Sequence, residues 1–256
     1  MFKYYFRIVL AFLFICINIH LSAINNYNLK RIDFDIPIPD NSVNSMLFDN
    51  ENSLWFYNSK GVYKFNGNQL IHINHLAQNG QLLNGLTIYS ISYIRNSVYV
   101  CTNQGIYNVN DANLVTKLNL PYTSQGIIQI LANSKNHLIL LTQNGQLVDY
   151  PEIGSVKFLN LSITQIGKMI IIHDTIFVTA TKKIISNSYV FKVSPSFKLI
   201  NEYCIHEGIF LKSITSYKNS LFCITKNHVI SYIPEKDSFV MFNKKLKNID
   251  FIIASK

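Results

Sequence analysis

Short apolar runs alternate with clusters of Asn, Asp, Ser and Gly along most of the chain, with examples at SVNSMLF (42–48), TIYSISYI (87–94) and GIIQILA (126–132). This pattern predicts short strands joined by tight turns rather than helices. The 17 Phe and 15 Tyr residues, together with many Ile, Val and Thr, also favour strands. The chain is therefore expected to be all-β.

One segment of ten residues recurs five times. The copies read LWFYNSKGVY, VYVCTNQGIY, LILLTQNGQL, IFVTATKKII and LFCITKNHVI, and they begin at Leu54, Val98, Leu138, Ile176 and Leu221. Successive copies start 38 to 45 residues apart, and none needs an internal gap. Four short strands per unit at such a period are typical of a β-propeller blade.

Each copy is flanked by residues that favour tight turns. The preceding pairs are Asn52-Ser53, Asn96-Ser97, Asn136-His137, Asp174-Thr175 and Asn219-Ser220. Asn and Asp tolerate the left-handed backbone that such turns need. The turn within the first three copies contains Gly61, Gly105 or Gly145, whereas Lys183 and His228 stand there in the last two, so those turns are expected to differ.

These units predict an all-β fold, a β-propeller of four-stranded antiparallel blades. A sandwich or a single barrel is the alternative, but neither predicts one decapeptide recurring so regularly. A domain over 24–256 would contain blades near 42–76, 87–120, 126–161, 167–200 and 210–243, and a partial sixth blade at 248–256. Five blades and one strand would leave an unpaired edge unless a strand at 29–36 closed the ring, so we expect an incomplete ring in a truncated chain.

The first 23 residues resemble a secretory signal peptide. A basic segment, MFKYYFR, precedes the apolar run IVLAFLFICINI, and HLSA ends in small residues. Cleavage is expected after Ala23, which would place the chain in the periplasm or outside the cell. A retained membrane anchor is the alternative, but the apolar run is short against the roughly 20 residues that a spanning helix needs.

Neither the charge nor the cysteine content suggests a specialised class of protein, such as a nucleic-acid-binding or disulfide-rich protein. Removal of residues 1–23 would lower the formal charge from +9 to +7, and the lysines are scattered, so a solvated basic surface is expected rather than a nucleic-acid site. The remaining cysteines, Cys101, Cys204 and Cys223, are odd in number and do not form a disulfide framework. Cys101 and Cys223 lie in apolar runs and are expected to be buried thiols.

Candidate chemistry is sparse. His72 and His75 have a spacing that binds zinc on a helix, but the local pattern is strand-like and would separate the two rings. Cys204 and His206 would share a strand face without a third ligand nearby. The acidic residues that stand out are Asp33, Asp35 and Asp40 near the N-terminus and Asp149, Glu152 and Asp174 at expected strand ends. No catalytic residue, metal site or cofactor is predicted.

The first unit, SVNSMLFDNENSLWFYNSKGVYKFNGNQLIHI, resembles the two-component regulator propeller repeat. Asp49, Trp55, Gly61 and Tyr63 match the repeat, together with Leu54 and Val62, while Asn58 stands where Thr is usual. Later copies retain further repeat positions, namely Thr102, Gly105, Tyr107, Thr142, Gly145 and Thr225. Trp55 has a sugar-stacking alternative, but its place between Leu54 and Phe56 favours packing in the core or between blades.

The resemblance implies the sensor region of a periplasmic hybrid histidine kinase or regulator. Its expected function is an exported, ligand-sensing N-terminal input region with no catalytic module of its own. The implied partners are an oligosaccharide or other small ligand and a second propeller or homodimer partner, with no nucleic acid and no membrane span after signal removal. The alternatives are a stand-alone secreted propeller that binds protein or glycan and, less favoured, a propeller lyase or glycosidase.

The signal-peptide assignment predicts a defined mature N-terminus. When the full chain is expressed in a Gram-negative host, Edman sequencing of the exported product should start at Ile24. Replacing Ala23 with Lys should block cleavage, because signal peptidase requires a small residue there. An exported product that still carries residues 1–23 would contradict the assignment.

Overall fold

The computed structural model describes residues 42–73, 83, 85–120, 126–163, 165–182, 187–205, 211–217, 220–225 and 228–241. The chain divides into two units, residues 1–35 and 36–256, and every described residue belongs to the second. The strands expected at 29–36 and 248–256 lie outside the described residues.

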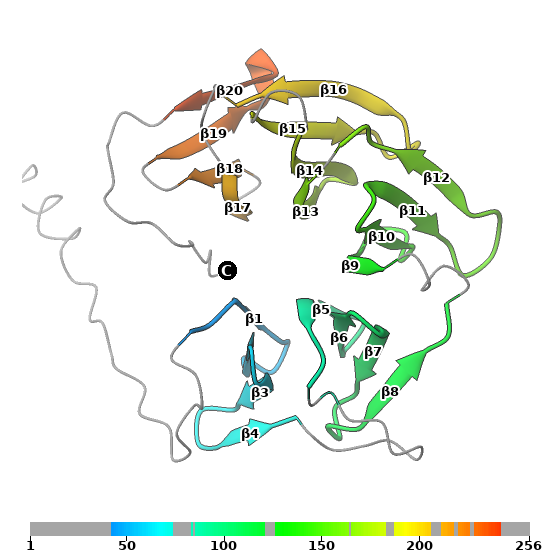
Figure 1. Cartoon of the computed structure of the whole chain (residues 1–256), viewed down its shortest axis with the longest axis vertical. Helices are drawn as coiled ribbons and strands as arrows, with labels where there is room; N and C mark the ends of the chain where they lie inside the picture. Colours follow the sequence, from blue (N-terminus) through cyan, green and yellow to red (C-terminus); the bar gives the residue numbers. More distant parts are fainter. Residues whose placement is uncertain are drawn as a thin grey trace, which may run out of the picture. The chain divides into compact units, whose positions relative to one another are not determined.

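The described strands form five antiparallel sheets of four strands, each sheet built from strands that are consecutive in the chain (Figure 1). Blade 1 contains β1 (Ser45–Phe48), β2 (Leu54–Asn58), β3 (Gly61–Phe65) and β4 (Leu70–His72). Blade 2 contains β5 (Ile88–Ile94), β6 (Ser97–Thr102), β7 (Gly105–Val109) and β8 (Val115–Leu118). Blade 3 contains β9 (Ile127–Ala132), β10 (Leu138–Thr142), β11 (Gln146–Tyr150) and β12 (Lys157–Asn160).

Blade 4 contains β13 (Gln165–Ile172), β14 (Thr175–Thr181), β15 (Ser188–Val193) and β16 (Leu199–Cys204). Blade 5 contains β17 (Leu211–Tyr217), β18 (Ser220–Thr225), β19 (Val229–Ile233) and β20 (Ser238–Met241), with the short 3₁₀ helix η2 (Pro234–Lys236) before β20. The first strand of each blade lies nearest the middle of the ring (Figure 1). This arrangement confirms the predicted all-β propeller of four-stranded blades. Within the described part of the chain, no hydrogen-bonded strand joins blade 5 to blade 1.

Among the described residues, the core contains four apolar clusters, one between each pair of successive blades. Side chains of a second strand alternate between two of them, because successive residues of a strand face opposite sides of the sheet. Val98 and Val100 of β6 pack toward blade 1, whereas Cys101 packs toward blade 3. Ile139 and Leu141 of β10 pack toward blade 4, and Leu140 packs toward blade 2. The second strands are therefore covered on both faces, as their apolar sequences predict.

Trp55 is a packing residue between blades 1 and 2, where its side chain is only 2% exposed. Its indole N–H donates a hydrogen bond of 2.8 Å to Asp49 Oδ2. Asp49 Oδ1 accepts further bonds from the backbone N–H groups of Glu51 (3.0 Å) and Ser53 (2.8 Å). The Asp and Trp of the repeat thus fix the turn between β1 and β2 to the inter-blade core.

The turns between the first and second strands have the left-handed backbone expected from their sequence. The φ angles are 61° at Asn52, 60° at Asn96, 61° at Asn136 and 59° at Asp174, which confirms that prediction in four blades. Asn219 lies outside the described residues.

The repeated Thr and Gly positions build the turn between the second and third strands. Thr102 Oγ1 accepts a bond from the Gln104 N–H (3.1 Å) and donates one to Gly105 O (2.9 Å). Thr142 and Thr225 make equivalent bonds, the latter to the backbone of His228, which replaces the glycine. In blade 1, Asn58 Oδ1 accepts from the Lys60 N–H at 2.8 Å, so an amide oxygen takes over the role of the threonine hydroxyl.

Two of the repeat glycines have backbone conformations that residues with a side chain rarely adopt, with φ of 124° at Gly105 and 84° at Gly145. At Gly145 a Cβ atom would also lie 2.9 Å from Leu161 O. The repeat tyrosines Tyr63 and Tyr107 are each 2% exposed, and Tyr63 stacks on the ring of His72.

Replacing Trp55 with Ala should lower the free energy of unfolding by about 3–5 kcal/mol, because it leaves a cavity between two blades and removes the Asp49 hydrogen bond. Urea denaturation measures this change. Trp55→Phe, which keeps most of the apolar contact, should cost clearly less. Near-native stability of Trp55→Ala would contradict the packing role.

Candidate functional site

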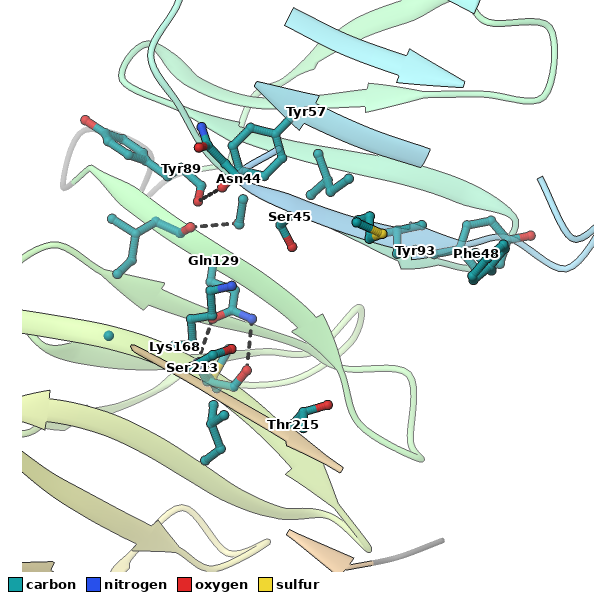
Figure 2. Close-up of a pocket in the computed structure, with 18 of the residues that line it drawn as sticks. Asn44, Ser45, Phe48, Tyr57, Tyr89, Tyr93, Gln129, Lys168, Ser213 and Thr215 are labelled. Atoms are coloured by element: carbon teal, nitrogen blue, oxygen red, sulfur yellow. Dashed lines mark hydrogen bonds between the residues drawn. The ribbon is translucent and has the colours of Figure 1, made fainter. Parts of the chain in front are cut away.

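The first strands of all five blades line one cavity of about 800 Å³ (Figure 2). It is the candidate functional site, because ligand sites are concave and combine apolar walls with a few convergent polar groups. Its polar and charged lining residues are Asn44, Ser45, Asp49, Asn50, Asn52, Ser90, Gln129, Lys168, Ser213 and Thr215. Tyrosines 57, 89 and 93 contribute amphipathic rings.

The first strands of blades 2 to 5 each contain a β-bulge where they border the cavity. In β9, for example, Ile127 pairs with Thr142 and Gln129 pairs with Leu141, so Ile128 is an additional residue. The pairing of β5, β13 and β17 shifts at similar positions. Bulges bend a strand and redirect its side chains, and they are frequent beside functional sites.

Side chains from one blade hold the bulge of the next. The hydroxyl of Tyr57 in blade 1 donates to Tyr89 O in blade 2 at 2.8 Å, and Ser90 Oγ donates to Ile128 O in blade 3 at 2.7 Å (Figure 2). Each acceptor is the carbonyl of a bulge residue, which the regular ladder leaves available. These bonds tie neighbouring blades together at the wall of the cavity.

Gln129 makes two such bonds to one residue of the next blade. Its Nε2 donates to Met169 O at 2.9 Å, and the Met169 N–H donates to Gln129 Oε1 at 2.7 Å, so the amide of blade 3 binds both backbone groups of a residue in blade 4 (Figure 2). The paired bonds fix the β13 bulge against β9. We name the bonds made by Tyr57, Ser90 and Gln129 the inter-blade clamps.

The β13 bulge places Lys168 at the cavity. Ile166 pairs with Ala180 and Met169 with Val178, so Gly167 and Lys168 together stand opposite Thr179. Thr179 Oγ1 accepts a bond from the Lys168 N–H (2.8 Å) and donates one to Lys168 O (3.1 Å). A Cβ on residue 167 would lie 2.3 Å from Thr179 Oγ1, so the bulge requires glycine there. Local backbone bonds therefore determine where Lys168 is held.

Lys168 and Asp49 are the charged residues that line the cavity, and they differ in how they are paired. Burial raises the pKa of Asp49, but the hydrogen bonds from Trp55 and Ser53, together with Lys64, outweigh it and hold that pKa below its usual value. Burial lowers the pKa of Lys168. Within the described part of the chain no acceptor or carboxylate contacts its ammonium group.

The acidic residues noted at expected strand ends lie away from the cavity lining and are engaged elsewhere. Asp149 is 2.8 Å from His137 Nδ1, Glu152 forms an ion pair with Arg95 of blade 2, and Asp174 accepts a 2.7 Å bond from the Ser134 N–H. The last two contacts join neighbouring blades. These carboxylates therefore have structural partners in this fold.

The other candidate residues are only partly described. His72 lies in β4, and Cys204 is exposed in β16, while His75, His206, Asp33, Asp35 and Asp40 lie outside the described residues. Among the residues that are described, no three His, Cys, Asp or Glu side chains gather as a metal site would require.

Cys101 and Cys223 are buried in the inter-blade clusters, as their apolar surroundings predict. Burial raises the pKa of each thiol to about 12, so both are protonated at neutral pH. They behave as small apolar side chains rather than as nucleophiles.

Sequence reasoning did not identify the clamps or Lys168. One signal was present, since Gly167 and Lys168 interrupt an otherwise apolar strand ending in MIII. A glycine and a charge within such a run indicate a bulge or a close backbone approach. Ser90 and Gln129 gave no such signal, because their partners lie in other blades.

No protein-family model and no curated protein sequence matches the chain. Solved structures do resemble it. A catalytically inactive virginiamycin B lyase from Staphylococcus aureus, with quinupristin, is 14% identical, with a TM-score of 0.65 over 85% of this chain and 75% of that one. The extracellular domain of a hybrid two-component system from B. thetaiotaomicron is 17% identical, with a TM-score of 0.62 over 85% of this chain and 29% of that one.

A third similar structure is PorZ, a surface component of the type-IX secretion system of Porphyromonas gingivalis. It is 17% identical, with a TM-score of 0.54 over 80% of this chain and 27% of that one. Identities this low establish the fold alone, so the repeat-family assignment made from Asp49 and Trp55 stays a prediction. Over the residues described, the structure contains no helix long and apolar enough to span a membrane.

Replacing Lys168 with Met should raise the melting temperature at pH 7, because it removes a partly buried charge that has no counter-ion among the described residues. The folded state lowers the pKa of Lys168 below its ordinary 10.5, so burial of the charge destabilises the fold fully at low pH. That penalty disappears as the pH rises from the lowered pKa toward 10.5. The advantage of the variant should therefore shrink over that interval.

Thermal unfolding monitored by circular dichroism at several pH values measures this difference. Lys198→Met is the matched control, since Lys198 is exposed in the turn between β15 and β16 and its replacement should change little. A Lys168→Met variant that is less stable than the wild type at pH 7 would show that the charge of Lys168 does not destabilise the fold.

Proposed function

We propose that this chain is an exported, ligand-sensing β-propeller that forms the N-terminal input part of a two-component type of signalling protein and catalyses no reaction itself. The observation that carries the proposal is the cavity of about 800 Å³ lined by the first strands of all five blades. Its volume lies within the roughly 300–1,000 Å³ of typical small-molecule sites.

The lining suits a small polyhydroxylated ligand such as an oligosaccharide released from a polysaccharide. Hydroxyl and amide groups of Asn44, Ser45, Ser213 and Thr215 supply hydrogen-bond donors and acceptors from blades 1 and 5. Tyr89 and Tyr93 of blade 2 offer rings against which the apolar face of a sugar can pack.

The inter-blade clamps link ligand binding to the relative placement of the blades, which is the signal. A ligand in this cavity touches several blades at once, and the clamps of Tyr57, Ser90 and Gln129 connect those blades along the same wall. Occupancy would favour one relative placement of the blades, because a ligand shifts a conformational equilibrium by its difference in affinity for the two states. A second propeller or a second copy of the chain would read out that change.

Two findings support an exported sensor. Residues 1–23 have the pattern of a signal peptide, and extracellular domains of hybrid two-component systems are among the similar structures. A lyase is similar in fold as well. Against catalysis in this cavity, its charged lining residues are Asp49, whose carboxylate is occupied, and Lys168, whereas acid–base chemistry usually needs two available groups at one point.

The test is a thermal-shift and calorimetry screen of the exported full chain against enzymatic digests of plant and host polysaccharides. At about 100 times its dissociation constant, a ligand should stabilise the fold by roughly 2.7 kcal/mol. Mass spectrometry should recover the bound fraction unchanged.

Ser45→Tyr, which fills part of the cavity, should abolish the shift. Ser155→Tyr is its matched control, because Ser155 is exposed before β12 and lies outside the cavity lining. Absence of a shift with every digest, or undiminished binding by a folded Ser45→Tyr protein, would refute the proposed site. Recovery of a cleaved ligand would instead identify an enzyme.

A further inference from the structure

We propose that the cavity selects a small ligand that carries a single negative charge, a sugar acid or a sugar sulfate, and that Lys168 binds its anionic group. This inference rests on the proposed function and adds the chemical class of the ligand. Lys168 contributes the charge of the site, and the neutral part of the ligand would contact the hydroxyl and amide groups of blades 1 and 5.

Lys168 differs from the other described lysines that are at least partly buried, Lys64, Lys182 and Lys192, each of which has a carboxylate partner. Four described lysines each lie within salt-bridge distance of a carboxylate, namely Lys64 with Asp49, Lys157 with Asp149, Lys182 with Glu202 and Lys192 with Asp237. Lys168 lies at the cavity with no carboxylate against it within the described residues. A partly buried ammonium group without such a partner is most readily satisfied by an anion that arrives with the ligand.

Hydrogen bonds from two blades hold the backbone around Lys168 in place. Both backbone groups of Lys168 are bonded to Thr179, and both backbone groups of the next residue, Met169, are bonded to Gln129 of the neighbouring blade. Gly167 permits the close approach to Thr179 that this geometry needs. A lysine held by two blades presents its charge with less conformational freedom than a lysine on a loop, which favours selective binding.

Asp49, the second charged residue that lines the cavity, does not neutralise the charge of Lys168. Asp49 accepts bonds from Trp55, Ser53 and Glu51, its side chain is only 6% exposed, and Lys64 lies 3.7 Å from Oδ2. Asp49 also follows the C-terminal end of β1, whereas Lys168 lies in the first half of β13. Among the described residues, the cavity therefore has one available positive charge, which suits a monoanion better than a polyanion.

Hydrogen-bonding groups for the rest of the ligand lie in the same cavity. Ser213 and Thr215 belong to β17, which packs beside β13, and Asn44 and Ser45 belong to the start of blade 1. Figure 2 shows Lys168 and Ser213 among the residues that line this wall. A sugar ring needs several hydroxyl contacts of this kind in addition to the charge.

Isothermal titration calorimetry with matched sugar pairs tests the inference. The probes are galacturonate against galactose, glucuronate against glucose, and N-acetylglucosamine 6-sulfate against N-acetylglucosamine, so that each acidic probe carries one negative charge. At least one acidic probe should bind the full chain about tenfold or more tightly than its neutral partner. The carboxylate and sulfate arms identify which anion the site prefers.

Lys168→Met should weaken binding of that acidic probe by about ten- to a hundredfold, in line with loss of a charge-assisted hydrogen bond, and should leave its neutral partner unaffected. Lys168→Arg should retain the preference for the acidic probe, and Lys198→Met should bind like the wild type. Thermal unfolding of each variant verifies that it is folded.

Equal binding of acidic and neutral partners, or unchanged binding of the acidic probe by folded Lys168→Met, would overturn the assignment of Lys168. If neutral sugars bind and Ser45→Tyr abolishes that binding, the charge selectivity fails while the proposed function stands. If neither these probes nor the polysaccharide digests bind, both proposals fail.

Discussion

The structure depends on burial of both faces of each four-stranded sheet. Such a sheet is too small to form a core by itself, and its strongly apolar second strand has no polar face to present to water. Successive blades solve this problem for one another, because Val98 and Val100 of β6 pack toward blade 1 while Cys101 packs toward blade 3. Packing of each blade against the next curves the series of five around a central cavity that their first strands line.

The same packing leaves polar backbone groups to be satisfied at the cavity wall. The bulges of the first strands expose carbonyl groups, and Tyr57 and Ser90 of neighbouring blades bind two of them. Gln129 extends this pattern by binding both backbone groups of Met169. The bonds that complete the inter-blade contacts therefore also position Lys168, so the stability of the ring and the chemistry of the cavity have a common origin.

Polar contacts at the ends of the blades reinforce the apolar interfaces. Ser134 binds Asp174 across blades 3 and 4, and Asp237 accepts bonds from Lys192 and Tyr203 across blades 4 and 5. Those bonds, together with Tyr232, hold the pKa of Asp237 well below its usual range, and this carboxylate remains charged at neutral pH. Charged side chains in the described part of the chain therefore pair within a blade, as Lys182 does with Glu202, as well as between blades, as Lys192 does with Asp237.

The sequence alone determined the blade and its turns, because these depend on residues close together in the chain. Alternating apolar residues predicted the strands, the recurrent decapeptide predicted five blades, and Asn52 and Asn96 marked left-handed turns that the backbone angles confirm. The tertiary structure alone decided which residues meet at the axis. Ser90 and Ile128, or Gln129 and Met169, come from different blades about 40 positions apart, and no local pattern encodes their contact. The placement of Lys168 depends on both local and tertiary contacts. Gly167 and Thr179 create its bulge within one blade. Its exposure to a central cavity exists only after five blades have packed together.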